Sequence, residues 1–86
     1  MNGMELENTV EYFTAPNGDH VSIMTTPEGT ATAIVCHPVN NVLYFRRKYN
    51  SRAIAMREMV KDFGTLDCTT MVQTWRKVDR SRSAGV

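Results

Sequence analysis

Four side chains of this 86-residue chain are of the types that bind metals or act as nucleophiles: His20, Cys36, His37 and Cys68. Structural zinc sites usually take two ligands from one turn, as in Cys-x-x-Cys, so that both meet the metal at tetrahedral angles. Cys36 and His37 are adjacent, and adjacent residues of a strand point to opposite faces of the sheet. The spacing therefore predicts no metal site.

Cysteine catalysis needs a thiolate in an electropositive, partly exposed setting with a base within reach. Cys36 ends an apolar stretch and Cys68 lies among apolar residues, so both are interpreted as buried packing residues with free thiols. The motifs G-x-G-x-x-G, G-x-S-x-G and H-E-x-x-H and the P-loop pattern do not occur. We therefore expect a protein with no catalytic residues, no metal and no cofactor.

Cations interleaved with aromatic side chains are the most distinctive pattern of the second half of the chain. This composition is compatible with phosphate contact combined with base stacking, or with an ordinary solvated surface on which Glu58, Asp62 and Asp79 pair with the cations. The sequence pI of about 7.8 is below the value typical of nucleic-acid-binding domains. The candidate binding residues are Tyr44, Arg46, Arg47, Lys48, Tyr49, Arg52, Arg57, Lys61, Arg76 and Lys77.

The net charge of +1 conceals a strong asymmetry along the chain. Residues 1–45 contain five acidic residues and no Lys or Arg, whereas residues 46–86 contain all ten basic residues and four acidic ones. This division predicts a bipolar molecule in which either the acidic or the basic surface is the interface, unless folding brings the opposite charges together. The opposed halves could also pair across a homodimer.

Four strands are expected to position these side chains. Residues 9–14, 20–25, 30–36 and 42–47 are rich in β-branched, aromatic and small apolar residues, and turn sequences with Asn-Gly, Pro or Asn separate them. The connections are short, which favours an antiparallel meander. The near-continuous apolar character of the third strand predicts burial on both of its faces.

A helix is expected over residues 51–63, where the period of the apolar pattern changes to 3.6. The expected buried face consists of Ala53, Met56, Met59, Val60 and Phe63. Asn50 is the expected N-cap, which would let Tyr49 and Ile54 form a hydrophobic staple. Gly64 is placed where a helix-ending residue with positive φ is favoured.

Residues 68–78 carry signals for two kinds of element. The β-branched Thr69, Thr70, Val72 and Thr74 suit a strand, but Cys68, Met71, Val72, Trp75 and Val78 recur at helical spacing, and Asp67 is a good N-cap. A second helix is predicted. The expected fold class is α+β, a four-stranded antiparallel meander followed by one or two helices packed on one face (ββββαα). Residues 1–8 are expected to be a flexible N-terminus, 9–78 the domain, and 79–86 a disordered basic tail.

The chain contains no apolar run of membrane-spanning length and no signal-peptide pattern, so a cytoplasmic location is expected. The leading hypothesis is a small non-enzymatic regulator or inhibitor, monomeric or homodimeric, that docks on a protein partner. The alternative is a nucleic-acid-binding domain that uses the basic end of the fourth strand and the helix face. In character the chain is similar to small accessory proteins of phages and mobile elements that act on host machinery, although the likeness covers no motif.

Overall fold

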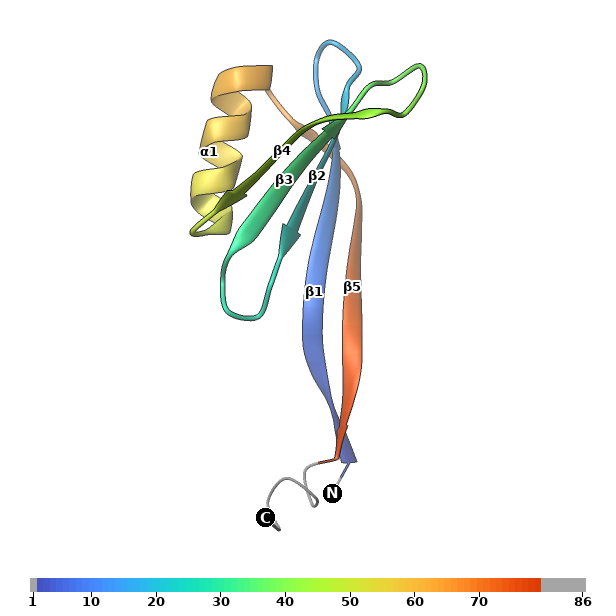
Figure 1. The fold of residues 1–86 in the computed structure, drawn as a ribbon, viewed down its shortest axis with the longest axis vertical. Coiled ribbons are helices and arrows are strands. Elements are labelled where there is room, and N and C mark those ends of the chain that lie inside the picture. The colour runs from blue at the N-terminus through green and yellow to red at the C-terminus, as the bar shows by residue number, and fades with distance from the viewer. Residues whose placement is uncertain (1, 80–86) are drawn as a thin grey trace.

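The computed structural model describes residues 2–79, which form one five-stranded antiparallel sheet and one helix (Figure 1). The order along the chain is β1 (Asn2–Thr14), β2 (His20–Thr25), β3 (Ala31–Cys36), β4 (Leu43–Tyr49), α1 (Arg52–Phe63) and β5 (Asp67–Asp79). The order across the sheet is β4-β3-β2-β1-β5. The α+β class and the four-stranded meander are confirmed, and a fifth strand returns to pair with β1.

The meander forms because each connection has the turn chemistry that an antiparallel pair needs. In the β1–β2 turn the N–H of Gly18 donates to the carbonyl of Ala15 at 2.9 Å, and Gly18 has a φ of 93°. The β2–β3 turn is closed in the same way, with the N–H of Gly29 donating to the carbonyl of Thr26 at 2.9 Å. A positive φ costs glycine little, since it has no Cβ to clash with the backbone.

Helix α1 begins one residue later than expected. The side chain of Ser51, not of Asn50, caps the helix, because its Oγ accepts a hydrogen bond from the N–H of Ile54 at 3.2 Å. The predicted N-cap at Asn50 is therefore wrong, and Ile54 packs partly buried against the core cluster to which Tyr49 belongs. Gly64 ends the helix as expected, with a φ of 90° and its N–H donating to the carbonyl of Val60 at 2.8 Å.

The buried face of α1 is also rotated from the expected one. Ala55 and Met59 are fully buried, Met56 is partly buried, and Ala53 and Val60 are exposed. Apolar residues extend around a wide part of the helix surface, and packing against the sheet determines which of them are buried.

The predicted second helix over Cys68–Val78 is wrong, because this segment belongs to β5. This strand pairs with β1 from Asn2 to Thr14, with register shifts between Leu6 and Asn8 and between Tyr12 and Phe13. Residues 2–8, expected to be a flexible segment before the domain, belong to β1 and pair with β5. The remainder of the expected tail, residues 80–86, lies outside the described residues.

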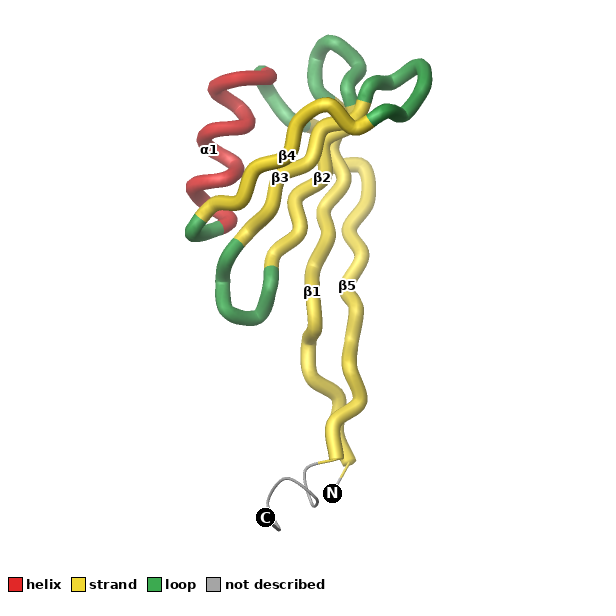
Figure 2. Tube along the Cα trace, in the orientation of Figure 1, coloured by secondary structure: helices red, strands yellow, loops and turns green. Residues whose placement is uncertain are grey.

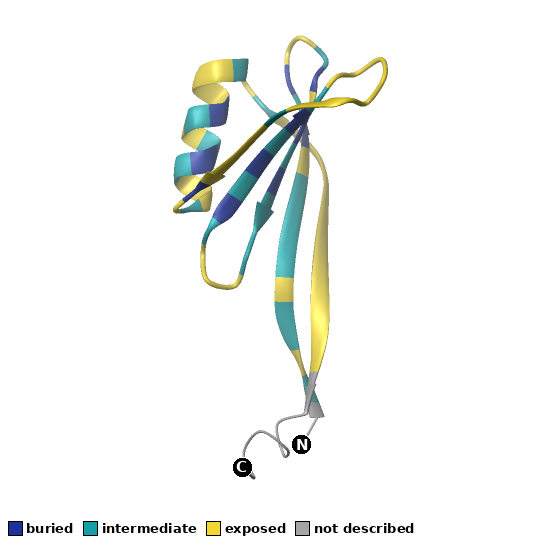
Figure 3. Ribbon diagram, viewed as in Figure 1, coloured by how far each residue is buried: buried dark blue, intermediate teal, exposed yellow. Residues whose placement is uncertain are grey.

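The hydrophobic core lies between α1 and the middle of the sheet. Helix α1 packs against β2, β3 and β4, and β3 is buried on the face toward the helix but only partly covered on the other. Figure 3 shows burial concentrated in these elements, whereas β5 is exposed from Asp67 to Lys77. The buried apolar residues are Phe13, Ala15, Val21, Ile23, Ala31, Ala33, Val35, Tyr49, Ala55 and Met59.

Strands β1 and β5 continue past the rest of the sheet as a two-stranded extension (Figure 2). Strand β2 pairs with β1 only over residues 9–14, so residues 2–8 of β1 pair with β5 alone. We call residues 2–8 and 74–79 the ribbon. The extents of 52 × 24 × 19 Å and the radius of gyration of 15.9 Å reflect this elongation, since a compact domain of this length has a radius of about 12 Å.

Candidate macromolecule-binding surface

The sheet face opposite α1 is not covered by any element within residues 2–79 and is here called the open face. Paired residues of antiparallel strands share a face, so the register identifies its members. One row across the strands consists of Val72, Val10, Met24, Thr32 and Lys48. The next row consists of Thr70, Tyr12, Ser22, Ile34 and Arg46. Each row runs from β5 to β4 and ends in a cation at the β4 edge.

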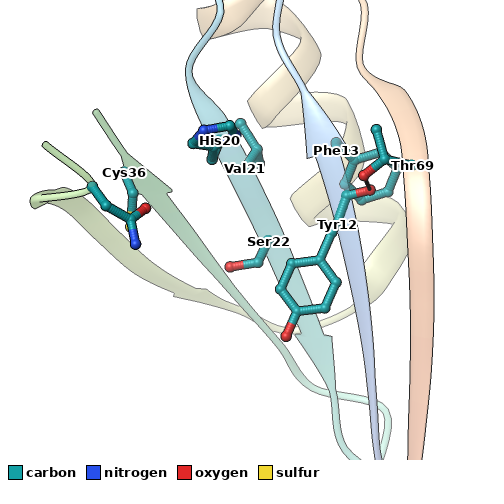
Figure 4. Close-up of a pocket in the computed structure, with 8 residues that line it drawn as sticks. Tyr12, Phe13, His20, Val21, Ser22, Cys36 and Thr69 are labelled. Atoms are coloured by element: carbon teal, nitrogen blue, oxygen red, sulfur yellow. Dashed lines mark hydrogen bonds between the residues drawn. The ribbon is translucent and has the colours of Figure 1, made fainter. Parts of the chain in front are cut away.

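An open cavity of about 310 Å³ lies at the end of this face nearest the β1–β2 turn, and Tyr12, His20, Ser22, Cys36, Asn41 and Thr69 contribute to its lining. Figure 4 shows Tyr12 and Ser22 projecting from neighbouring strands beside it. His20 and Cys36 are cross-strand partners, so the structure places a histidine beside a cysteine in a combination that sequence spacing does not reveal.

The other two residues with metal-ligand chemistry lie elsewhere. His37 is in the β3–β4 loop, where its Nδ1 accepts a hydrogen bond from the N–H of Val39 at 3.3 Å. Cys68 is exposed on β5, so its interpretation as a buried packing residue is wrong; Cys36 is partly buried, and both are free thiols. In the part of the chain that the structure describes, no three His, Cys, Asp or Glu side chains form a group that could hold a metal ion.

The three consecutive cations of β4 do not share a face. Arg46 and Lys48 belong to the open face, whereas Arg47 is paired with Ala33 and belongs to the helix side. The guanidinium carbon of Arg47 lies 5.6 Å from the ring centroid of Tyr49, within cation–π range. Tyr49 is only 8% exposed and belongs to the core, where burial raises the pKa of its hydroxyl.

Tyr44 is held by intramolecular contacts. A register shift in the β3–β4 pairing occurs at this residue, and its ring lies 6.5 Å from that of Phe63 on α1. Its hydroxyl donates a hydrogen bond to the carboxylate of Asp19, a buried residue. Loss of hydration, together with this bond to a negative group, raises the pKa of Tyr44 to about 12. The hydroxyl of Tyr44 therefore has an intramolecular acceptor and does not need one from a binding partner.

Two of the remaining candidate cations are paired with acidic residues of the first half of the chain. Arg52 makes a two-pronged ion pair with Glu11, in which Nη2 lies 2.8 Å from Oε2. Hydrogen bonding from Arg52 lowers the pKa of Glu11, and Glu11 in turn raises that of Arg52. Arg76 lies 3.5 Å from Glu5 across the ribbon. Folding thus brings opposite charges together. The acidic and basic surfaces are therefore less separated than the division of charge along the chain predicts.

The ten candidate binding residues consequently do not form one surface. Arg57 and Lys61 are exposed on α1, which packs beside β4. Arg76 and Lys77 lie on β5, at the opposite edge of the sheet and on the ribbon. Arg46 and Lys48 are the members of the set within the five-stranded part of the open face, and Arg76 lies on the same side of β5 but farther along the ribbon. The alternation within β2 predicts that Met24 lies on a second, less apolar face that could be a contact surface, whereas Tyr12 and Ile34 could be assigned to that face only once the strand register was known.

Comparison with protein-family models, curated proteins and solved structures finds no match to this chain. Within residues 2–79, no helix has both the length and the apolar character needed to cross a membrane. The case for function therefore depends on the composition and geometry of the open face.

Proposed function

We propose that this protein is a small non-enzymatic binding module that docks on a protein partner through its open face. The observation that supports this most strongly is the pair of cross-strand rows, with Val10, Tyr12, Met24 and Ile34 at the centre and Arg46 and Lys48 at one border. Protein interfaces have this anatomy, since an apolar centre enriched in Tyr and Met lies inside a polar rim that often contains Arg.

The same composition defines the chemistry of the partner. A matching surface is apolar where it meets the middle of the sheet and acidic where it meets Arg46 and Lys48. Charges at such a border mainly set the association rate and orientation, whereas the apolar centre supplies most of the affinity. A module that covers a partner's surface in this way acts as a regulator or inhibitor by occlusion, and we propose that it does so in the cytoplasm.

A nucleic-acid partner fits this face less well. Single-stranded nucleic acids bind platforms on which several aromatic rings each stack a base. Among the described residues, Tyr12 is the one Phe, Tyr or Trp that the register places on the open face. Tyr49 is buried in the core, and Tyr44, although 50% exposed, lies beside Phe63 on the helix side. A protein partner is therefore favoured.

The test compares capture of proteins by the wild-type chain and by two double variants in the native cells. The first variant, Tyr12→Asp with Arg46→Glu, changes one apolar and one basic residue of the same open-face row. The matched control, Val60→Asp with Arg57→Glu, makes equivalent changes on the exposed surface of α1. After cross-linking and nuclease treatment, captured proteins are identified by mass spectrometry.

We expect one stoichiometric partner with the wild type and the control, and none with the open-face variant. Equal capture by all three proteins would contradict the proposal, as would loss of capture only in the α1 variant. If nuclease removes the captured species, or if purified protein binds DNA or RNA with a steep salt dependence, the nucleic-acid alternative is favoured instead.

A further inference from the structure

The two edges of the sheet differ in how they are protected from pairing with another strand. At the β4 edge, Arg46, Arg47 and Lys48 follow one another directly. At the β5 edge, residues 67–75 contain no Lys, Arg, Pro or Gly. Soluble proteins generally protect exposed edge strands with charges, proline or irregular backbone, because an unprotected edge pairs with other chains. Asp67 and the register shift at Thr69 protect one end of this stretch, so residues 70–75 are the part of the β5 edge that remains open to a further strand.

No element within residues 2–79 covers the side chains on the helix-side face of β5. Met71 is 57% exposed and Trp75 is 51% exposed, and the register places Trp75 beside Leu6 of the ribbon. Met4 on the same extension is 59% exposed. Helix α1 packs against β2, β3 and β4, and an isolated two-stranded ribbon is at best marginally stable in water. These residues need a partner surface to become buried.

We infer that this surface is supplied by a second copy of the chain, whose β5 pairs antiparallel with the β5 of the first around a two-fold axis at Gln73. In this register Met71 of one copy lies directly opposite Trp75 of the other, and symmetry repeats the contact. Sulfur–aromatic contacts of this kind are favourable. We place the two-fold axis at Gln73 because it is the midpoint between Met71 and Trp75, so that Met71 of each copy meets Trp75 of the other in an isologous contact.

The basic residues of β5 are compatible with the same register over residues 69–77, beyond which Asp67 of one copy would lie opposite Asp79 of the other, so we expect the pairing to be confined to these central residues. Arg76 of one copy lies opposite Thr70 of the other, and Lys77 lies near Thr69, so the basic end of each strand avoids its own equivalent. The pairing joins the two five-stranded sheets into a single ten-stranded sheet. The β4 strands, whose edges carry Arg46, Arg47 and Lys48, are its two outer strands. The β5 edges of both copies are then paired with each other, so no third copy can add and the assembly is a closed dimer.

The wild-type protein provides the first test. Light scattering coupled to size-exclusion chromatography should give a mass of twice the 9.7 kDa of the chain. Trp75 is the single tryptophan, so its fluorescence reports this interface directly and should shift to longer wavelength as dilution separates the copies. A monomer at all concentrations, or an open-ended series of larger species, would overturn the inference.

Charge variants at the axis test the register. In Gln73→Lys two lysines oppose each other across the dimer, and the dimer Kd should rise about tenfold or more, whereas the exposed lysine costs the monomer little. Gln73→Glu should behave alike, and an equimolar mixture of the two variants should recover the dimer. Val39→Lys, at a loop residue that is 87% exposed, is the matched control and should dimerise normally. A Gln73→Lys protein that dimerises like this control would refute the proposed pairing.

The inference is independent of the partner proposed above. The open-face variant Tyr12→Asp with Arg46→Glu should still form a dimer, and Gln73→Lys should still present an intact open face to the partner. The failure of one proposal would thus leave the other standing.

Discussion

The hydroxyl of Thr74 bridges both backbone polar groups of Asn8. It accepts a hydrogen bond from the N–H of Asn8 at 3.1 Å and donates one to the carbonyl of the same residue at 3.2 Å. The bridge lies where the β1–β5 register shifts between Leu6 and Asn8, so a side chain satisfies backbone groups at an interruption of the ladder. Thr69 has a related role at the other register shift, where its hydroxyl donates to the carbonyl of Tyr12.

Replacing Thr74 by Val keeps the β-branched shape and removes the hydroxyl. We expect this change to destabilise the protein by about 1 kcal/mol and to accelerate amide hydrogen exchange in residues 2–8. Thr70→Val, the same change at an exposed β5 position away from the ribbon and beside the other register shift, is the control and should leave exchange in the ribbon unaltered. Equal effects of the two substitutions would show that the bridge contributes nothing.

The Glu11–Arg52 ion pair predicts a pH-dependent part of the stability. Because the pKa of Glu11 is lowered in the folded protein, this contribution is complete above the ordinary glutamate pKa and is lost as the pH falls through the lowered folded value. Glu11→Gln should reduce the free energy of unfolding by about 1 kcal/mol at neutral pH, with the deficit vanishing in acid. Urea titrations over this pH range measure the difference. Glu28→Gln, in an exposed turn, is the control, and its free energy of unfolding should equal that of the wild type at neutral pH.

The hydrogen bond from Tyr44 to Asp19 predicts an effect in alkali. Since the folded pKa of Tyr44 is raised to about 12, its stabilising contribution is complete below the ordinary tyrosine pKa and is lost as the pH rises through the folded value. Asp19→Asn removes the negative acceptor and should let Tyr44 ionise at a lower pH. Phenolate absorbance follows this titration, with a Tyr44→Phe protein identifying the signal. An unchanged titration in Asp19→Asn would contradict the assignment.

Gly29 and Gly64 have nearly equal φ angles but differ in the space that a Cβ would find. Gly29 has a φ of 94°, and a Cβ added there would meet no atom within 4 Å, whereas at Gly64, with a φ of 90°, a Cβ would lie 3.1 Å from Cγ of Pro16. Gly29→Ala should therefore cost about 1 kcal/mol from backbone strain alone. Gly64→Ala should cost at least about 1 kcal/mol more, measured by chemical unfolding. Equal costs would mean that Pro16 moves aside freely.

The parts of the fold that were predictable from sequence are those determined by neighbouring residues. The turns at Gly18 and Gly29 and the helix end at Gly64 follow from local backbone preferences, and these boundaries place four strands and the helix. Strand β5 was not predictable in this way, because its pairing partner lies at the other end of the chain. Its helical spacing and its β-branched residues compete locally, and pairing with β1 decides between them.

The candidate surface was predictable only in part for the same reason. Arg46 and Lys48 stand out as cations at the end of a strand. Their neighbours on the open face, such as Tyr12 and Met24, come from other strands, and only the register brings them into one row with the cations. Arg52 shows the converse, since nothing in its sequence environment reveals that Glu11, 41 residues earlier, has already paired with it.

The location of the core has a consequence for the order in which the protein can be assembled. Every buried apolar residue of the described chain lies between Phe13 and Met59, whereas β5 begins at Asp67. During synthesis, all of the core is therefore available before β5 leaves the ribosome. The meander and α1 can then condense first, with β1 as a temporarily unpaired edge, and β5 adds last because its contacts close the longest loop in the molecule.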